Sequence, residues 1–372
     1  MLLFITSTLR TEIKAMDKRK VIVVNASAAT SGGALTILKL FTSSINDEIN
    51  SYYIYVSSQV IDLLDKKVNI IYIETDTSSW LKRIKWDFYL FKRNLKNNKI
   101  KPDKILSLQN TSVNHDSRQI IYLQQALPFV DHKWGLLISG QFKLFLYCSV
   151  YRFFISAFIR NVDAIIVQTS WMREVVSKKL RFDKGCIYVI RPEVKIHPID
   201  TATEIIKSER KILFYPTSAM KYKNYEMLAY VIKECSDEYE LHITLEKGES
   251  KKFDRIVSEL DIQLSVIYTG KISYERVVEY YQACDTLVFP SKIESFGLPL
   301  IEAAYFKKRI IAADLPYARE VLQGYDGAFF CNSEIWSDWV KAIKNDKLTS
   351  DNNLTLASSS PDGNLNILFD LL

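Results

Sequence analysis

Short runs of β-branched and aromatic residues alternate with longer amphipathic stretches along most of the chain. The runs are continuous apolar segments rather than strict apolar–polar alternations, which is typical of parallel strands buried on both faces. Helical periodicity between the runs, for example at 35–45, 224–236 and 274–284, predicts doubly wound α/β domains. The strands expected from this pattern are 21–25, 52–57, 68–74, 104–108, 119–123, 164–168, 186–190, 211–216, 241–246, 264–270, 286–291, 309–314 and 327–330.

The alternation is interrupted at 191–211, where two prolines and a polar run precede a fresh strand. We expect a linker there, between an N-terminal domain at 20–191 and a C-terminal domain at 192–345. The total of 372 residues suits two domains of ordinary size. Residues 1–19 are expected to be an extension outside the fold. Residues 346–372 are expected to be a Ser/Asn-rich tail, too polar for a core, whose NILFDLL end could pack back on the N-terminal domain.

Composition excludes several classes of protein. Hydrophobic residues make up 48% and charged residues 25%, which is a globular balance and not that of a disordered or fibrous chain. The five cysteines are far apart and form no CxxC or Cys/His cluster, so neither a disulfide scaffold nor a zinc site is expected. The longest apolar stretch, 134–158, is broken by Lys143 and Arg152, so no transmembrane helix is expected.

The net charge of +6 is unevenly distributed. Residues 82–104 hold nine Lys or Arg and two Asp, and the aromatic-rich stretch 132–162 holds four Lys or Arg and no acid. The rest of the chain is therefore mildly acidic. A solvated basic face would account for this pattern. Basic charge beside apolar and aromatic side chains also suits an anionic membrane surface, and we expect the N-terminal domain to bind one.

The stretch VFPSKIESFGLPLIEAAYFKKRIIAAD, residues 288–314, is the most informative part of the chain. A strand ends at Pro290, and a loop leads to Pro299, which suits the first position of a helix. The unpaired N–H groups of a helix N-terminus attract anions, and Gly297 would let a diphosphate approach the backbone. Glu302 could then accept hydrogen bonds from a ribose diol, and Glu294 could face a sugar. Glutamate is also common in first helical turns, so these two residues alone do not decide the function.

The residues around Glu294 and Glu302 are more specific than the two glutamates alone. With YYQACDTLVFPS before it and Asp314-Leu-Pro after it, ESFGLPLIE resembles the signature of retaining glycosyltransferases of family 4, bacterial surface-polysaccharide type. The resemblance is dense over 211–330 and only general before that. It implies a GT-B fold, in which two Rossmann-like domains face each other across a cleft, the N-terminal one for the acceptor and the C-terminal one for a nucleotide sugar. It also implies donor contacts from Glu294, Glu302 and the backbone of Ser295, Phe296, Gly297 and Leu298.

A second element is FYPTSAMKYKNYEMLAYVI, residues 214–232. Lys223 lies where a loop meets a helix, so its ammonium could reach a phosphate as a point charge. The family pattern has an arginine five residues earlier, where this chain has Ser218. Either Ser218 and Thr217 donate neutral hydrogen bonds to the diphosphate, or Lys221 supplies the second charge. Lys223 and Glu294 are the candidate catalytic residues.

Three further loops are weaker candidates. Gly270 permits a tight turn, and the resemblance places Lys271 and Ile272 near the nucleotide base, although a surface turn explains the pattern equally well. The pair Gly32 and Gly33 opens a helix but is not GxGxxG, so no nicotinamide cofactor is expected. The resemblance places this pair near the donor phosphate and the acceptor, where a plain tight turn is the alternative. Gln124 stands where the family usually has a histidine near the donor sugar, so it and Gln125 would be neutral hydrogen-bonding groups on the acceptor side of the cleft.

The sequence therefore predicts a retaining hexosyltransferase that uses a UDP-, GDP- or dTDP-linked sugar and a glycan or lipid-linked acceptor, in O-antigen or capsule biosynthesis. No cofactor is expected, and metal is expected to be unnecessary, because no acidic DxD-like cluster occurs and Lys223 with a helix dipole can neutralise the diphosphate. The expected location is cytoplasmic, on the inner face of the cell membrane. The alternative is a GT-B-like sugar-nucleotide-binding or scaffold subunit without activity, which Ser218 and Gln124 keep open. A nucleic-acid binder would explain the basic stretches but not the Glu/FGLP context, so no nucleic acid is expected as a partner.

Overall fold

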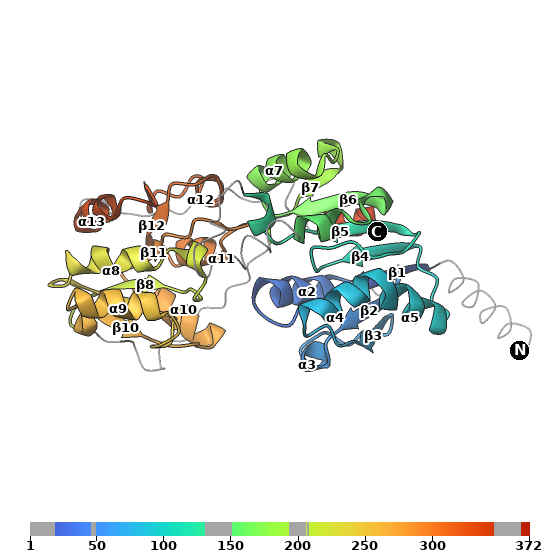
Figure 1. Ribbon diagram of the computed structural model, residues 1–372, viewed down its shortest axis with the longest axis horizontal. Coiled ribbons are helices and arrows are strands. Elements are labelled where there is room, and N and C mark those ends of the chain that lie inside the picture. Colours follow the sequence, from blue (N-terminus) through green and yellow to red (C-terminus); the bar gives the residue numbers. More distant parts are fainter. Residues whose placement is uncertain (1–18, 46–49, 131–150, 193–205, 207, 346–365) are drawn as a thin grey trace, which may run out of the picture. The chain divides into compact units, whose positions relative to one another are not determined.

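The computed structural model describes residues 19–45, 50–130, 151–192, 206, 208–345 and 366–372 (Figure 1). The chain divides into two units, which are Met1–Glu193 with Pro361–Leu372 and Val194–Ser360. The expected extension at 1–19, except for Arg19, lies outside the described residues. So do most of the expected linker and residues 132–150 of the second basic stretch.

Within the described residues, the first unit holds a wholly parallel sheet in the order β3-β2-β1-β4-β5-β6-β7. Its strands lie where the apolar runs predicted them. They are β1 (Lys20–Asn25), β2 (Asn50–Val56), β3 (Ile70–Glu74), β4 (Lys104–Ser107), β5 (Arg118–Tyr122), β6 (Val162–Val167) and β7 (Ile187–Val189). Its main helices are α2 (Gly32–Ser44), α3 (Ser58–Ile61), α5 (Phe91–Asn97) and α7 (Ser170–Leu180), and α5 continues from α4 (Trp80–Lys85) through the π-helical turn η1 (Trp86–Leu90).

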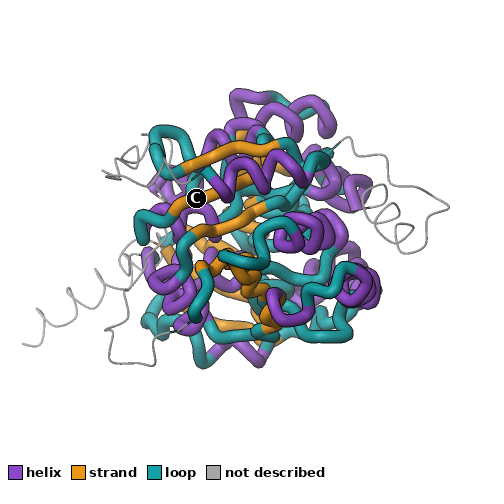
Figure 2. The backbone as a smooth tube through the Cα atoms, turned by 90° about the vertical axis from the view of Figure 1, so that its left-hand side faces the viewer, coloured by secondary structure: helices purple, strands orange, loops and turns teal. Residues whose placement is uncertain are grey.

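Helices pack on both faces of this sheet, as two separate apolar clusters show. Figure 2 distinguishes the strands of the chain from the helices that flank them. Ile22 and Val24 of β1 belong to the apolar cluster that contains Phe41 of α2. Val23, between them, belongs to a second cluster with Phe91 of α5. Because successive side chains of a strand point to opposite faces, a continuous apolar run such as VIVV serves both clusters at once.

The end of the chain is part of this unit's core. Helix α14 (Asn366–Leu371) buries Leu368, and Leu372 follows it into the cluster of α2. The Phe369 ring stacks on Phe41 with centroids 5.5 Å apart, and the Lys20 ammonium donates to the Leu372 carbonyl over 3.2 Å. The NILFDLL end thus packs back on the N-terminal unit as expected, whereas the expectation that 346–372 is too polar for a core is wrong at this end. Tertiary packing stabilises so short a helix, which makes its local sequence signal weak.

The second unit holds, within the described residues, a parallel sheet in the order β10-β9-β8-β11-β12-β13. Its strands are β8 (Lys211–Tyr215), β9 (Tyr239–Ile243), β10 (Val266–Tyr268), β11 (Thr286–Phe289), β12 (Arg309–Ala313) and β13 (Ala328–Cys331). Its helices are α8 (Glu226–Lys233), α9 (Lys251–Glu259), α10 (Tyr274–Ala283), α11 (Leu298–Tyr305), α12 (Pro316–Val321) and α13 (Trp336–Lys344). Across the described parts of both units, no helix is both long and apolar enough to span a membrane.

Both sheets are doubly wound, as predicted. In each, the strand order reverses beside the first strand, between β1 and β4 and between β8 and β11. Sheets of this type bind ligands beyond the carboxyl ends of the strands at that reversal. The fold therefore directs attention to the loops that follow β8 and β11, and to those that follow β1 and β4.

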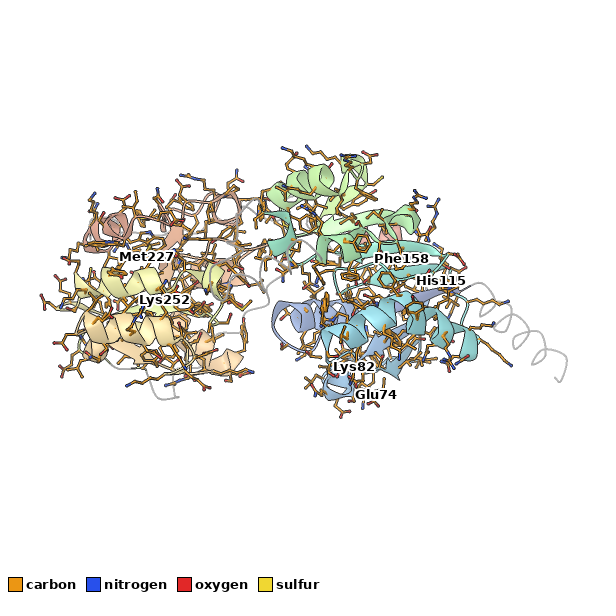
Figure 3. The ribbon with its side chains drawn as sticks, in the orientation of Figure 1. Glu74, Lys82, His115, Phe158, Met227 and Lys252 are labelled. Atoms are coloured by element: carbon orange, nitrogen blue, oxygen red, sulfur yellow. The ribbon has the colours of Figure 1, made fainter. Side chains whose placement is uncertain are left out.

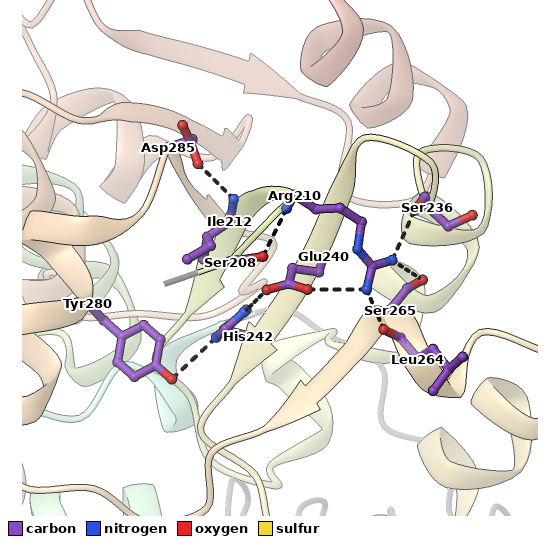
Figure 4. A network of polar contacts seen from close by, with 10 residues as sticks. All are labelled: Ser208, Arg210, Ile212, Ser236, Glu240, His242, Leu264, Ser265, Tyr280 and Asp285. Atoms are coloured by element: carbon purple, nitrogen blue, oxygen red, sulfur yellow. Dashed lines mark hydrogen bonds and ion pairs between the residues drawn. The ribbon is translucent and has the colours of Figure 1, made fainter. Parts of the chain in front are cut away.

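A polar network joins strands of the second sheet at the end opposite to their carboxyl ends (Figure 4). The Arg210 guanidinium donates to the Glu240 carboxylate over 3.2 Å and to the Ser265 hydroxyl over 2.8 Å. The other Glu240 oxygen lies 2.6 Å from Nε2 of His242, whose Nδ1 lies 3.3 Å from the Tyr280 hydroxyl. Arg210 precedes β8, Glu240 lies near the start of β9 and Ser265 precedes β10, so their contacts join the amino ends of three neighbouring strands, while His242 links β9 to Tyr280 of α10.

Candidate active site

The loops after β8 and β11 bring the two candidate catalytic residues together. The two strands are parallel neighbours, with Leu287 paired to Phe214, so their loops leave the sheet side by side. Lys223 ends the short turn η5 (Lys221–Lys223) after β8, and Glu294 lies in the loop after β11. The Lys223 ammonium is 2.5 Å from Oε1 of Glu294.

This ion pair is largely sheltered from water, with 18% of the Lys223 side chain and 15% of the Glu294 side chain exposed. Burial lowers the pKa of Lys223, but the Glu294 carboxylate and Tyr222 raise it by more, so the pKa ends above its ordinary value. The ammonium also lies 5.5 Å from the centre of the Tyr222 ring, a cation–π distance. Lys223 is therefore held protonated, as a fixed positive charge at the strand-order reversal.

Backbone contacts fix the loop that carries Lys223. The Tyr215 hydroxyl donates to the Lys223 carbonyl over 2.8 Å, and the Lys292 amide donates to the Tyr222 carbonyl over 2.8 Å. The next residue, Asn224, adopts a left-handed conformation with φ of 57°, and its side-chain amide donates to the Ser333 carbonyl. The loop after β8 is thus tied to the loop after β11.

Gly297 starts α11 in a conformation that favours glycine, with φ of 90°. A Cβ at this position would lie 3.2 Å from Cδ1 of Leu300, which is a tight contact. Pro299 is the second residue of α11, one position later than expected. Since the first N–H groups of a helix have no intrahelical partner, the start of α11 carries donors and partial positive charge beside Glu294.

The other residues of this loop are partly or fully enclosed. Ser295 and Leu298 are half-buried, and Phe296 is buried. The Tyr317 hydroxyl donates to the Ser291 carbonyl over 2.6 Å and holds the beginning of the loop. No local pattern indicated this Tyr317 contact, because it joins positions 26 residues apart on different elements.

Glu302 already has protein partners. Its side chain is buried, and its two carboxylate oxygens accept hydrogen bonds from Tyr281 over 2.8 Å and from Tyr274 over 3.3 Å. Burial raises the pKa of Glu302, while the two tyrosine hydroxyls act in the opposite direction. Sequence reasoning missed both tyrosines. Their spacing of seven residues, which places them on one face of α10, is the signal that could have found them.

The remaining donor-side candidates lie on loops at the same edge of the second sheet. Ser218 is exposed, and its carbonyl accepts from the Met220 amide over 2.7 Å. Gly270, with φ of 67°, makes the tight turn expected of it. Lys271 beyond it is exposed and Ile272 half-buried, and both follow β10, two strands away from β8.

The acceptor-side candidates lie at the carboxyl edge of the first sheet. Gly32, with φ of 58°, and Gly33 are exposed at the start of α2, after β1. Gln124 follows β5, and its backbone amide donates to Oδ1 of Asn110 over 2.5 Å. Gln125 beside it is half-buried. The structure thus places all four residues at the carboxyl edge of the first sheet.

A buried carboxylate beneath that edge escaped the sequence reasoning. Asp87, in the turn η1, accepts hydrogen bonds from Gln109 over 2.8 Å, from Thr111 over 2.7 Å and from Asn25 over 3.2 Å. Burial raises the pKa of Asp87 to about 7, although these three bonds and the charge of Arg83 act against that rise. Asp87 stands in a strongly basic stretch with no motif around it, and π-helical turns, which often occur at functional sites, have no clear sequence pattern.

Comparison with known families bears directly on the second unit, because the family described as Glycosyl transferases group 1 matches residues 198–355. The matched segment covers most of the second unit, Val194–Ser360. The O-antigen chain mannosyltransferase RfbU of Salmonella typhimurium is 25% identical over 197 residues, which are 52% of this chain and 54% of RfbU. The serotype-specific mannosyltransferase WbdA of Escherichia coli is 40% identical over 79 residues, 21% of this chain and 9% of WbdA. The chain thus matches about half the length of RfbU and a small part of WbdA.

Several solved structures share the fold. Sucrose-phosphate synthase from Thermosynechococcus elongatus superposes with a TM-score of 0.65 at 15% identity, covering 87% of this chain and 89% of the synthase. Anabaena HepE, solved with UDP and glucose, gives a TM-score of 0.64 at 12% identity, covering 89% of this chain and 92% of HepE. WaaG, a glycosyltransferase involved in lipopolysaccharide biosynthesis, gives a TM-score of 0.61 at 14% identity, covering 88% of this chain and 92% of WaaG. The GT-B fold class expected from the sequence is confirmed.

Proposed function

We propose that the chain is a retaining glycosyltransferase that moves a hexosyl residue from a nucleotide sugar to a glycan or lipid-linked acceptor, in the synthesis of O-antigen or capsule polysaccharide. The Lys223–Glu294 pair, which lies at the strand-order reversal beside the start of α11, carries the proposal. Both residues lie inside the segment that matches Glycosyl transferases group 1. The mannosyltransferases RfbU and WbdA among the relatives support a polysaccharide role and make mannosyl donors the first to test.

In this proposal the donor diphosphate binds between the Lys223 ammonium and the first N–H groups of α11. Glu294, released from Lys223, then accepts hydrogen bonds from the donor sugar. The ribose hydroxyls replace the hydroxyls of Tyr274 and Tyr281 as hydrogen-bond donors to the Glu302 carboxylate. Lys271 and Ile272 contact the base, and Ser218 contributes a neutral hydrogen bond where the family has a charge.

In the proposed reaction, the bond between the anomeric carbon and the phosphate oxygen breaks, and its electron pair leaves with the diphosphate. The acceptor hydroxyl forms the new bond on the same face of the sugar, and a phosphate oxygen of the donor takes its proton. Lys223 and the α11 amides stabilise the charge that develops on the leaving diphosphate, which is where preorganised donors contribute most. The proposal requires no cofactor and no metal ion.

The test begins with a thermal-shift screen of UDP-, GDP- and dTDP-linked sugars, mannosyl donors first. Transfer is then followed as release of the nucleoside diphosphate, and the anomeric configuration of the product is read by NMR. Lys223→Met and Glu302→Ala should abolish transfer while the protein stays folded. Lys341→Met and Glu334→Gln remove the same charges from exposed positions of the second unit and should leave transfer unchanged. Near-normal turnover in Lys223→Met and Glu302→Ala would refute the site, and nucleotide binding without turnover on any acceptor would favour the scaffold alternative.

We also propose that the first unit binds the anionic inner face of the cell membrane, from the cytoplasmic side. Large apolar side chains are exposed on α4 and η1 and on the helical segment 151–156, where Leu81 is 73%, Tyr89 70% and Phe153 64% exposed. Ring contacts of Phe154 with Trp80 and with the helical turn η1 join these segments. Because 82–104 carries the strongest basic excess of the chain, apolar insertion and attraction to anionic lipid would act at one place.

Flotation with vesicles containing phosphatidylglycerol tests this surface. The protein should float at low salt and less at high salt, and it should not float with neutral vesicles. Leu81→Glu should reduce the floating fraction, whereas Leu63→Glu, at an exposed leucine after α3, should not. A protein that stays at the bottom with anionic vesicles at low salt does not bind as proposed.

A further inference from the structure

A cavity of about 480 Å³ opens at the carboxyl edge of the first sheet, beside the candidate acceptor loops but on the β3 side of β1. The loops after β1, β2 and β3 form its walls, so it lies away from the reversal between β1 and β4. Its size falls within the usual range of small-molecule sites. Seven of its lining residues are serines or threonines, Ser27 and Thr77 among them, and the others include Gln59, Glu74, Asp76 and Arg83.

The charges of this lining balance. Asp76 lies in an exposed ion pair with Lys82, so these two charges offset each other. That leaves the Glu74 carboxylate, which is exposed, and the Arg83 guanidinium, whose Nε is enclosed yet has no hydrogen-bond partner among the described residues. Figure 3 labels Glu74 and Lys82 beside α3 and α4. One acceptor of charge −1 and one donor of charge +1 suit a neutral ligand with many hydroxyls better than a phosphate or a carboxylate.

The buried Asp87 network holds the inner wall of the cavity in place. The side-chain NH₂ group of Gln109 donates to the Asp87 carboxylate over 2.8 Å. This turns the side-chain oxygen of Gln109 toward Ser27, and that oxygen accepts a hydrogen bond from the Ser27 hydroxyl over 2.7 Å. The Ser27 oxygen is therefore left as an acceptor. The Thr77 hydroxyl donates to the Ser27 carbonyl over 2.9 Å and ties the β3 loop to the β1 loop. The wall is preorganised, so a ligand would not have to order it.

We propose that this cavity binds a neutral sugar residue of the acceptor glycan. Arg83 and Glu74 hold vicinal hydroxyls of the sugar, and the serine and threonine hydroxyls of the lining exchange hydrogen bonds with the others. The inference rests on the proposed function, because it names the site on the first unit at which the acceptor is recognised. The donor site on the second unit is not part of it.

Binding of methyl α-mannoside, methyl α-glucoside and methyl α-galactoside to the full chain tests the proposal by saturation-transfer NMR without donor. Two variants alter the cavity, Arg83→Met by removing the cation and Gln59→Trp by filling the space from an exposed position. Arg93→Met and Asn97→Trp make the same changes on exposed positions of α5, outside the cavity. At least one glycoside should bind, and both cavity variants should weaken it about tenfold or more while the controls leave it unchanged.

Binding of a nucleoside diphosphate, measured in the same samples, separates this proposal from the proposed function. It should be equal in all variants, since the donor residues belong to the second unit. Failure of nucleotide binding in the wild-type chain would count against the glycosyltransferase and leave the cavity result readable. If no glycoside binds at the highest soluble concentration, or if one binds equally well in both cavity variants, the sugar site in this cavity is refuted.

Discussion

The Lys223–Glu294 pair can be tested by a double-mutant cycle built from Lys223→Met, Glu294→Gln and the double variant. A hydrogen bond between charged groups contributes about 1.5–3 kcal/mol, and breaking a fully buried pair costs about 3–5 kcal/mol. Here the donor–acceptor distance is 2.5 Å and less than a fifth of either side chain is exposed. Allowing for that residual exposure, we expect each single change to destabilise the second unit by about 2 kcal/mol, and the double change by little more, which gives a coupling energy of about 2 kcal/mol.

Because the chain has two units, one global unfolding curve would not report this site alone. Native-state hydrogen exchange read by mass spectrometry resolves the opening free energy of the segments that contain β8 and β11. The measurement is repeated with saturating UDP or GDP. The diphosphate should replace Glu294 as the partner of Lys223, so the coupling energy should fall well below its value in the free protein.

A second pair supplies the control. Lys292 and Glu334 lie 2.7 Å apart on the same side of the unit, but the Glu334 side chain is 67% exposed. Exposed pairs typically contribute less than about 1 kcal/mol. If the Lys223–Glu294 coupling is no larger than that of the Lys292–Glu334 cycle, the burial argument is wrong. A large coupling that saturating nucleotide leaves unchanged would mean that Lys223 does not receive the diphosphate.

Four further predictions concern separate parts of the chain. Gly297→Ala should cost about 1–2 kcal/mol in the opening of α11 and weaken nucleotide binding, because φ is 90° there; unchanged exchange rates would contradict this. Burial raises the pKa of Asp87 to about 7, above the unfolded value of about 4, so the first unit should lose stability as pH rises from about 4 to 7, and Asp87→Asn should remove most of that slope when the same segments are followed by exchange. Leu368→Ala should cost about 2–4 kcal/mol in the first unit and leave exchange in the second unit unchanged. Transfer should persist in excess EDTA, and a loss that Mg²⁺ restores would show that metal is needed.

The strands and the loops of interest could be read from the sequence for a physical reason. Strands buried on both faces must be apolar throughout, so the runs at 21–25 and 286–291 identified β1 and β11 within one or two residues. Loops after such strands share one edge of the sheet, which is why Lys223 and Glu294 could be placed at the same site before any contact was known. Gly297 was identified because few other residues suit a positive φ.

Contacts between distant residues could not be read in the same way. Lys223 and Glu294 are 71 residues apart, and no local pattern indicates that their charges meet. Glu302 looked free to bind a ribose, but its tyrosine partners come from α10, which packs against it only in the folded unit. Helix α14 looked like a polar tail because six residues carry too little periodicity to predict burial.

The sequence by itself determined the doubly wound architecture and the loops that end its strands, and it identified the stretch 288–314 as a candidate anion site, because each depends on neighbours along the chain. Only the tertiary structure decided which charges are paired, which carboxylates are buried and where the hydroxyl-rich cavity lies. Those properties depend on groups brought together from separate strands and on the exclusion of water between them. The same +6 chain therefore presents a fixed cation beside α11 in one unit and a neutral, hydroxyl-lined cavity beside β1 in the other.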